Sequence, residues 1–202
     1  MKDLPMFHEG SRELQDEFQT RKLADRLVEM VGRNTFTTED IAFISSRPMF
    51  FLATADAEGR PDCSYKGGAP GFVRVLDGQT LGFPSYDGNG MFKSLGNILV
   101  NPGVGLLFID FEKPKRLRVN GRAHIDRNDA LLAEYPGAQL IVRVHAEAIF
   151  PNCPRYIHGM QSGEISEYVP SADHIPPEPK WKTFPELQDV LPPCDFSHND
   201  ER

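Results

Sequence analysis

The sequence predicts a mainly β protein, an antiparallel barrel or sandwich with flanking helices. Two observations carry this prediction. Short apolar runs recur after residue 48 and are separated by tight-turn residues such as Asp77-Gly78, a pattern typical of antiparallel sheets. Residues 116–125 alternate strictly between polar and apolar side chains, so this strand has one core face and one polar face.

Helical patterns precede the strands. Residues 11–31 carry apolar side chains at spacings close to three and four, which predicts one amphipathic helix. Thr37 or Thr38, followed by two acidic residues, predicts the N-cap of a short second helix that ends before Pro48.

The strands that follow are short and close together. Residues 139–150 carry apolar side chains at even positions and include Arg143, His145 and Glu147 at odd positions, so this strand also has one polar face. The polar faces of the last two strands form either plain solvent surface or the wall of an anion site. The predicted strands are residues 49–55, 61–66, 71–76, 80–84, 104–111, 115–125 and 139–150.

A chain of 202 residues has room for one domain with terminal segments. No apolar run approaches the roughly 20 residues that span a bilayer, and the N-terminal residues lack the pattern of a signal peptide. We therefore expect a cytoplasmic protein that does not bind membranes. Cys63, Cys153 and Cys194 lie far apart without a CxxC motif, which indicates free thiols and neither a disulfide framework nor a metal site.

Charge is distributed unevenly along the chain. The net charge is −7, and nine acidic but only three basic residues follow residue 160. Residues 111–124 instead hold five basic residues and one acidic residue, a local patch that suits a small anionic ligand better than nucleic acid. Seven of the 17 prolines and Trp181 also follow residue 160. This composition predicts an extended arm that lies against the barrel or a partner subunit, with Trp181 as its anchor.

A glycine-rich turn leads into a further predicted helix within residues 85–99. The unpaired N–H groups at the start of such a helix, with Lys93 and a hydroxyl nearby, provide a physical basis for phosphate binding. Asn97 shares the helix face of Lys93. The alternative is a helix whose turn simply requires Gly88 and Gly90. The predicted apolar stripe of this helix consists of Met91, Leu95, Ile98 and Leu99.

A second segment offers ligands for the same anion. Residues 62–68 form a predicted strand that presents alternate side chains, and Lys66 would supply a second cation near the helix. Two independent segments together therefore predict a phosphate site.

Four stretches of the chain carry a specific order of motifs: FISSRPMFFLATADAEGRPDCSYKGG, LGFPSYDGNGMFKSLGNILVNPGVGLLFIDF, RLRVNGRAHI and AIFPNCPRYI. In content and order they resemble the flavin-binding split-barrel proteins related to pyridoxamine 5'-phosphate oxidase. The resemblance implies a six-stranded antiparallel split β-barrel and a homodimer with FMN at the subunit interface. It divides the chain into an N-terminal helical segment (1–36), an FMN-binding split-barrel domain (37–160) and an acidic, proline-rich C-terminal arm (161–202).

The resemblance also implies where FMN binds. Residues of the 62–68 strand border the flavin ring and ribityl chain, and residues of the 85–99 segment meet the ribityl phosphate. Two arginines of the basic strand and the turn at residues 152–156 face the cofactor, often from the second subunit; the alternative is surface charge and a structural turn. The implied cofactor-binding residues are Ser64, Tyr65, Lys66, Asn89, Lys93, Ser94, Asn97, Arg118 and Arg122.

The implied function is that of an FMN-dependent oxidoreductase acting on a small anionic or heteroaromatic substrate. Because a flavin carries out the electron chemistry itself, no catalytic side chain is assigned. Trp181 stands in PPEPKWKTFPEL, which lacks the arginine and histidine by which true pyridoxamine 5'-phosphate oxidases hold their substrate, so the vitamin substrate does not carry over. The alternative is a flavin- or haem-binding protein that acts as a carrier or sensor. The sequence has no GxSxG, HExxH or Walker motif to support a hydrolase or a nucleoside triphosphatase.

Overall fold

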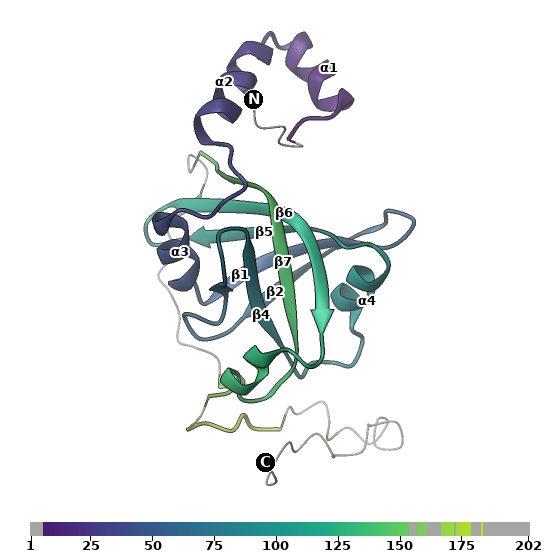
Figure 1. Cartoon of the computed structure of the whole chain (residues 1–202), viewed down its shortest axis with the longest axis vertical. Coiled ribbons are helices and arrows are strands. Elements are labelled where there is room, and N and C mark those ends of the chain that lie inside the picture. The colour runs from purple at the N-terminus through teal and green to yellow at the C-terminus, as the bar shows by residue number, and fades with distance from the viewer. Residues whose placement is uncertain are drawn as a thin grey trace.

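A curled antiparallel sheet forms the body of the protein, with α3 and α4 beside it and α1 and α2 beyond one end (Figure 1). The structure, a computed structural model, describes residues 6–153, 157–158, 160, 167–171, 173–178 and 183. Its elements are α1 (Glu9–Glu17), α2 (Arg21–Val31), α3 (Thr38–Ser45), β1 (Met49–Ala55), β2 (Pro61–Gly67), β3 (Arg74–Val75), β4 (Thr80–Tyr86), α4 (Lys93–Val100), β5 (Gly103–Asp110), β6 (Lys115–Asp126), a 3-10 helix η1 (Ala130–Glu134) and β7 (Ala138–Pro151).

The sheet curls around one core. Its strand order is β2-β1-β5-β6-β7-β4-β3, and the pairs are antiparallel. The ring of Phe50 on β1 lies 5.0 Å from that of Phe83 on β4 and 5.2 Å from that of Phe108 on β5. Three strands separate β1 from β4 in the sheet, so these rings can meet only because the sheet folds over. The predicted antiparallel split barrel with flanking helices is confirmed, with the two-residue β3 as a seventh strand.

The alternation predicted for residues 116–125 is confirmed in β6. Leu117, Val119 and Ala123 of β6 are buried, whereas the intervening Arg118 and Arg122 are exposed. The sheet therefore has an inner face that packs into the core and an outer face that carries the basic side chains.

The alternation predicted for residues 139–150 holds only in the middle of β7. Ile141 and Ile149 at odd positions are also buried, and Phe150 is only half-buried.

The helix predicted over residues 11–31 is two helices. The chain turns at Gln19, whose φ of 54° lies in the left-handed region, and a backbone with that angle cannot continue a right-handed helix. The amide of Thr20 donates to the carbonyl of Gln15, which completes the turn between α1 and α2.

The short helix α3 begins where the sequence predicts. The Thr37 hydroxyl accepts a hydrogen bond from the amide of Asp40, and the Asp40 carboxylate accepts one from the amide of Thr37, a capping box. Asp40 also pairs with Arg33, whose backbone bridges to Ile149 near the end of β7. This contact attaches the N-terminal helices to the sheet.

Two predicted features differ from the structure. The strand predicted over residues 71–76 is limited to β3, because the amide of Phe72 bonds to the carbonyl of Ala69 in a turn. The predicted apolar stripe of α4 is only half buried: Leu95 and Ile98 reach the core, whereas Leu99 and the preceding Met91 are exposed.

The chain contacts the barrel at the start of the C-terminal arm and again within it. The amide of Met160 donates to the carbonyl of Phe111, and Pro170 lies close to Gly137. Trp181, the predicted anchor, lies outside the described residues.

Gly121 is required by the pairing of β6 with β7. A Cβ at this position would lie 2.1 Å from the carbonyl oxygen of His145, beside the register shift between Asn120 and Gly121. We expect Gly121→Ala to lower the free energy of unfolding by about 1–3 kcal/mol, as overpacking does, measured by urea denaturation. Gly105→Ala is the matched control, because its Cβ would have no contact shorter than 3.5 Å; equal losses in both variants would contradict the prediction.

Candidate functional site

The inner face of β2 meets the start of α4 through two hydroxyls. Ser64 Oγ and Ser94 Oγ are 2.9 Å apart, and Ser94 is buried. Leu52 on β1 stands opposite Ser64 in register, and directly opposed residues project to the same face. Ser64 therefore belongs to the inner face, and the structure brings two of the predicted site residues together.

Lys66 lies two residues further along the same face of β2. It stands opposite the core residue Phe50, and burial lowers the pKa of its ammonium group, while the negative charge of Asp62 opposes this shift. Asp62, Ser64 and Lys66 thus form one polar row along the edge of an otherwise apolar inner face. Burial disfavours the charged form of Lys66, and an anion in contact with this row would favour it again.

The first turn of α4 is open toward the preceding loop. Its N-cap is Phe92, which has a φ of 46° and makes no side-chain capping bond. The amide groups of a helix's first turn have no partners inside the helix, and they carry the positive end of the helix dipole. Lys93 is exposed at the same place. This end of α4 therefore offers backbone amides, an ammonium group and the hydroxyl of Ser94.

Asn89 shapes the loop before α4. Its side-chain oxygen accepts from the amide of Met91 at 3.1 Å, and its amide nitrogen lies 3.4 Å from the sulfur of Met91. Gly90 between them has a φ of 73°, a conformation that glycine adopts without steric cost. Asn89 itself is exposed, so it both forms the turn and stays accessible.

Asn97 fastens α4 to the sheet. Its amide nitrogen donates to Thr54 Oγ1 at 3.0 Å, and both side chains are buried. The predicted shared face of Lys93 and Asn97 is therefore divided between solvent and core. The Asn97 side chain bonds within the chain and fixes the helix on the sheet. It does not reach the exposed N-terminal end of α4.

Tyr65, Arg118 and Arg122 lie on the outer face of the sheet. Tyr65 stands opposite Phe51, which pairs with Leu107, which in turn pairs with Arg118. Tyr65 is 63 % exposed, and its ring meets that of Phe51 edge to face.

Arg118 packs over the ring of Phe150, and Arg122 stands beside His145 of β7. The sheet thus separates these two arginines and Tyr65 from Ser64, Lys66 and Ser94 within one chain.

The turn after β7 is held by Arg116, whose guanidinium donates to the side-chain oxygen of Asn152 at 2.6 Å. Cys153 is a free, exposed cysteine. Pro154, Arg155 and Tyr156 lie outside the described residues.

Two polar residues of the site were not predicted. Thr54 occurs in an apolar strand, where a single threonine is an ordinary β residue, and only the fold reveals that it bonds Asn97. Asp62 could have been found, because it precedes Ser64 and Lys66 at the two-residue spacing of one strand face.

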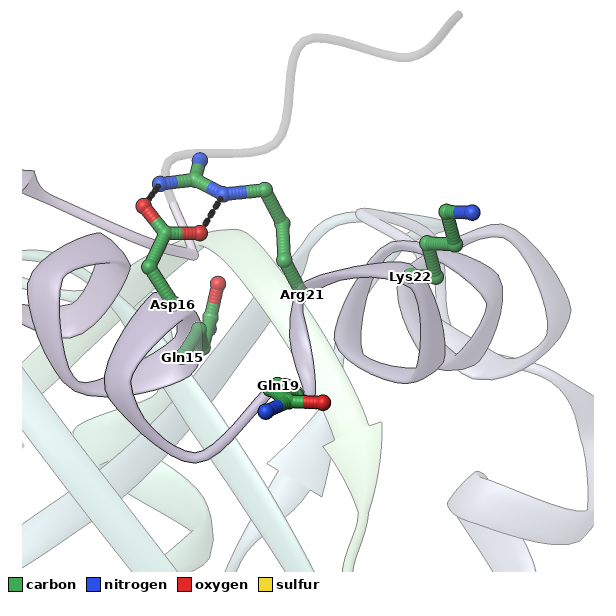
Figure 2. Close-up of a pocket in the computed structure, with 5 residues that line it drawn as sticks. All are labelled: Gln15, Asp16, Gln19, Arg21 and Lys22. Atoms are coloured by element: carbon green, nitrogen blue, oxygen red, sulfur yellow. Dashed lines mark hydrogen bonds and ion pairs between the residues drawn. The ribbon is translucent and has the colours of Figure 1, made fainter.

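A separate depression of about 430 Å³ lies between α1 and α2 (Figure 2). Its lining is formed by Gln15, Asp16, Gln19, Arg21 and Lys22, and Asp16 is paired with Arg21 across it. It belongs to the N-terminal helices and contains none of the predicted site residues.

The described part of the chain lacks the features of two further classes of site. Among those residues, no three His, Cys, Asp or Glu side chains are grouped as a metal site would require. No helix there is long and apolar enough to cross a membrane.

A curled antiparallel sheet, with a polar row facing the open end of a helix, defines a split-barrel protein. Residues 36–165 match the family described as pyridoxamine 5'-phosphate oxidase. The match covers more than half of the chain, and the protein belongs to this family. No curated protein matches the chain.

Several solved structures are similar to the chain. A putative pyridoxamine 5'-phosphate oxidase from Lactobacillus delbrueckii is 24 % identical, with 58 % of this chain and 95 % of that chain covered and a TM-score of 0.48. The haem storage protein HutZ from Vibrio cholerae is 22 % identical, with coverages of 56 % and 92 % and a TM-score of 0.41. An FMN-binding protein from Syntrophomonas wolfei is 12 % identical, with coverages of 69 % and 97 % and a TM-score of 0.42.

The half-buried Lys66 leads to a pH-dependent prediction. Its pKa is lower in the folded chain than in the unfolded chain, so the protonated form destabilises the fold, in full below the folded-state pKa. This destabilisation disappears as pH rises through the folded-state pKa toward the unfolded value. We expect ligand-free Lys66→Met to be more stable than wild type at neutral pH, with a difference that shrinks at alkaline pH, measured by urea denaturation.

The matched control for Lys66 is Lys93→Met, which removes an exposed lysine. A Lys66→Met variant that is less stable than wild type at neutral pH would show that burial does not dominate at this position.

Proposed function

We propose that this protein binds FMN as a homodimer and is an FMN-dependent oxidoreductase acting on a small substrate. The observation that carries the proposal is the contact between Ser64 and Ser94 at the uncapped end of α4, with Lys66 on the same strand face. Membership of the pyridoxamine 5'-phosphate oxidase family supports it.

The residues at this end of α4 fit the phosphate of FMN. A phosphate monoester needs several donors and compensation of its negative charge. Free amides of the first helical turn, the hydroxyl of Ser94 and the ammonium group of Lys93 supply both. Asn89 holds the adjoining turn, and Asn97 keeps the helix fixed on the sheet. The donors are therefore already oriented before a ligand arrives.

The positions of the basic residues favour a dimer. Arg118 and Arg122 extend from the outer face, and Ser64 and Lys66 from the inner face. A second subunit that packed on this outer face would bring its own polar row toward Arg118 and Arg122 of the first subunit. These arginines would then lie at the rim of the second subunit's site. We therefore assign the arginines to the flavin bound mainly by the partner subunit.

When bound, FMN supplies the hydride or electron transfer of the reaction. The chain's own groups bind and orient. Lys93 and Ser94 hold the phosphate end, Ser64 fixes the position of the Ser94 hydroxyl, and Lys66 keeps a positive charge beside negative charge that develops on the ligand. Tyr65 offers an exposed aromatic ring on the outer face of the sheet, where it, like the two arginines, would contact the flavin bound mainly by the partner subunit.

A carrier or sensor without turnover is the second candidate, and its cofactor could be a flavin or haem. The position of His145 beside Arg122 favours haem as the second cofactor to test, because imidazole is a common axial ligand of haem iron. HutZ, a similar structure, is a haem storage protein.

The spectrum of the purified protein and its reduction distinguish these functions. Flavin absorbance, reduction by NADH or NADPH and reoxidation by an added acceptor would support the oxidoreductase. Flavin absorbance without catalytic reoxidation would support the carrier, and a Soret band would support haem. A protein that binds neither FMN nor haem when each is added would contradict both.

The phosphate assignment predicts a difference between two flavins. Replacing Lys93 and Ser94 together by alanine removes contacts to the phosphate but none assigned to the ring. Charge-assisted hydrogen bonds contribute about 1.5–3 kcal/mol each, so we expect at least a roughly tenfold loss of FMN affinity and little change for riboflavin. Fluorescence titration of both ligands measures this.

Ser64→Ala is the control for the loss of the Ser64–Ser94 contact. It leaves the hydroxyl of Ser94 in place, so its effect on FMN affinity should be smaller. Equal losses of FMN and riboflavin affinity in the double variant would contradict the assignment to the phosphate.

A further inference from the structure

The two N-terminal helices pack with their polar sides together. Arg12 on α1 pairs with Asp25 on α2 at 2.6 Å, and Arg21 also donates to the carbonyl of Arg12. Figure 2 shows Arg21 reaching across to Asp16 at the turn between the helices. Ion pairs between partly exposed groups contribute little to stability, so these contacts alone hold the two helices weakly.

Their apolar side chains point outward instead. Neither α1 nor α2, both described throughout, contains a buried residue. Leu23, Leu27 and Met30 of α2 are 59 %, 47 % and 71 % exposed. Their spacing of four and three residues places them in one stripe along the helix, which we call the α2 stripe. Leu14 and Phe18 of α1 are exposed as well.

The charges of these helices argue against an anionic membrane as the surface that binds the α2 stripe. Residues 9–31 contain six acidic and four basic residues, whereas helices that lie on anionic lipid are rich in lysine and arginine. Both signs border the α2 stripe: Arg26 and Glu29 lie along one flank and form an ion pair at 3.4 Å.

We propose that the α2 stripe packs against the α2 stripe of a second copy of this chain, antiparallel across a two-fold axis. If the two-fold axis passes between residues 27 and 28, the second helix runs in the opposite direction. Arg26 of each helix then lies opposite Glu29 of the other. The same axis interleaves Leu23, Leu27 and Met30 with their counterparts, the arrangement in which helices pack side chains into gaps. The stripe and its charges are therefore complementary to themselves, as a two-fold contact requires.

The size of the stripe indicates that this contact adds to a larger interface. Three side chains exposed to this extent offer roughly 200 Å² of apolar area per copy, well below the roughly 800 Å² per partner of a stable complex. The proposal thus rests on the homodimer proposed above for the rest of the interface, but not on the identity of the cofactor. Residues 9–31 precede the family match at residue 36, so this contact is specific to the chain's own N-terminal segment.

The first test places a charge in the stripe. We expect Leu27→Glu to lower the association constant between copies at least tenfold, measured by sedimentation equilibrium of the full chain. Ile175→Glu is the matched control, because Ile175 is an aliphatic residue that is 91 % exposed far along the chain. Circular dichroism of each variant confirms that the barrel is folded. Unchanged association of folded Leu27→Glu would overturn the proposal.

The second test uses the flanking charges. Arg26→Glu and Glu29→Arg should each weaken association alone, because like charges then meet across the axis. Mixing the two variants should restore it, since each then faces the opposite charge. Breaking the Arg26–Glu29 pair within one helix cannot be repaired by mixing. Weakened association that mixing does not restore would therefore overturn the antiparallel contact.

Vesicle binding and FMN titration distinguish the α2 contact from a lipid surface and from the proposed function. Vesicles of phosphatidylcholine and phosphatidylserine that bind wild type but not Leu27→Glu would identify a lipid surface as the occupant and overturn the proposal. FMN titration of the same samples tests the proposed function independently: association that depends on Leu27 in a protein without flavin affinity would support the α2 contact and contradict FMN binding.

Discussion

The contact of Phe50 with Phe83 and Phe108 is the interaction on which the rest of the structure depends. Aromatic rings contribute large buried areas and prefer defined angles, and the contact between Phe50 and Phe83 joins strands that do not pair. Without this closure, β1 and β4 would lie at distant positions of an open sheet. With it, β2 becomes the rim of a barrel, and α4 can lie across β1 and β2. The polar site exists at this rim because a rim is where polar side chains can meet an apolar core and solvent together.

The site combines groups that stabilise the fold with groups that do not. Thr54 and Asn97 satisfy each other within the core, and a buried polar pair of this kind fixes one orientation of α4. Lys66 is different: it stands opposite Phe50 with its ammonium group partly desolvated. A partly desolvated ammonium group that an anion would stabilise fits the binding site proposed above, because functional sites often retain groups that do not favour the unliganded fold.

Local patterns in the sequence were enough to predict much of the fold. The alternation in β6 and the capping residues of α3 depend on neighbours within a few positions, and both were predicted correctly. The break at Gln19 was missed although it falls in the one five-residue interval, Phe18 to Leu23, of a pattern otherwise spaced by three and four. No glycine or proline marks the turn, and the longer interval was interpreted as part of one helix. Propensity cannot reveal that α1 and α2 turn their polar sides toward each other, since that choice depends on packing. The same limit applies to the site. The sequence predicted Ser64, Lys66 and Ser94 as neighbours, but which face of the sheet Tyr65 and Arg118 occupy depends on pairings across four strands, and such long-range register is not encoded in any local motif.

The paired hydroxyls of Ser64 and Ser94 have one further consequence. In the free chain either oxygen can donate to the other, so the bond has no fixed direction. A fully ionised phosphate bound at the end of α4, as proposed above, would accept hydrogen bonds only, so if Ser94 donates to it and keeps its bond to Ser64, Ser64 must be the donor of that bond. Binding there would therefore select one of two proton arrangements, and a chain of hydrogen bonds with one direction is stronger than its separate members. An anion bound at this end of α4 would thus polarise the edge of the barrel through the orientation of two hydroxyl protons.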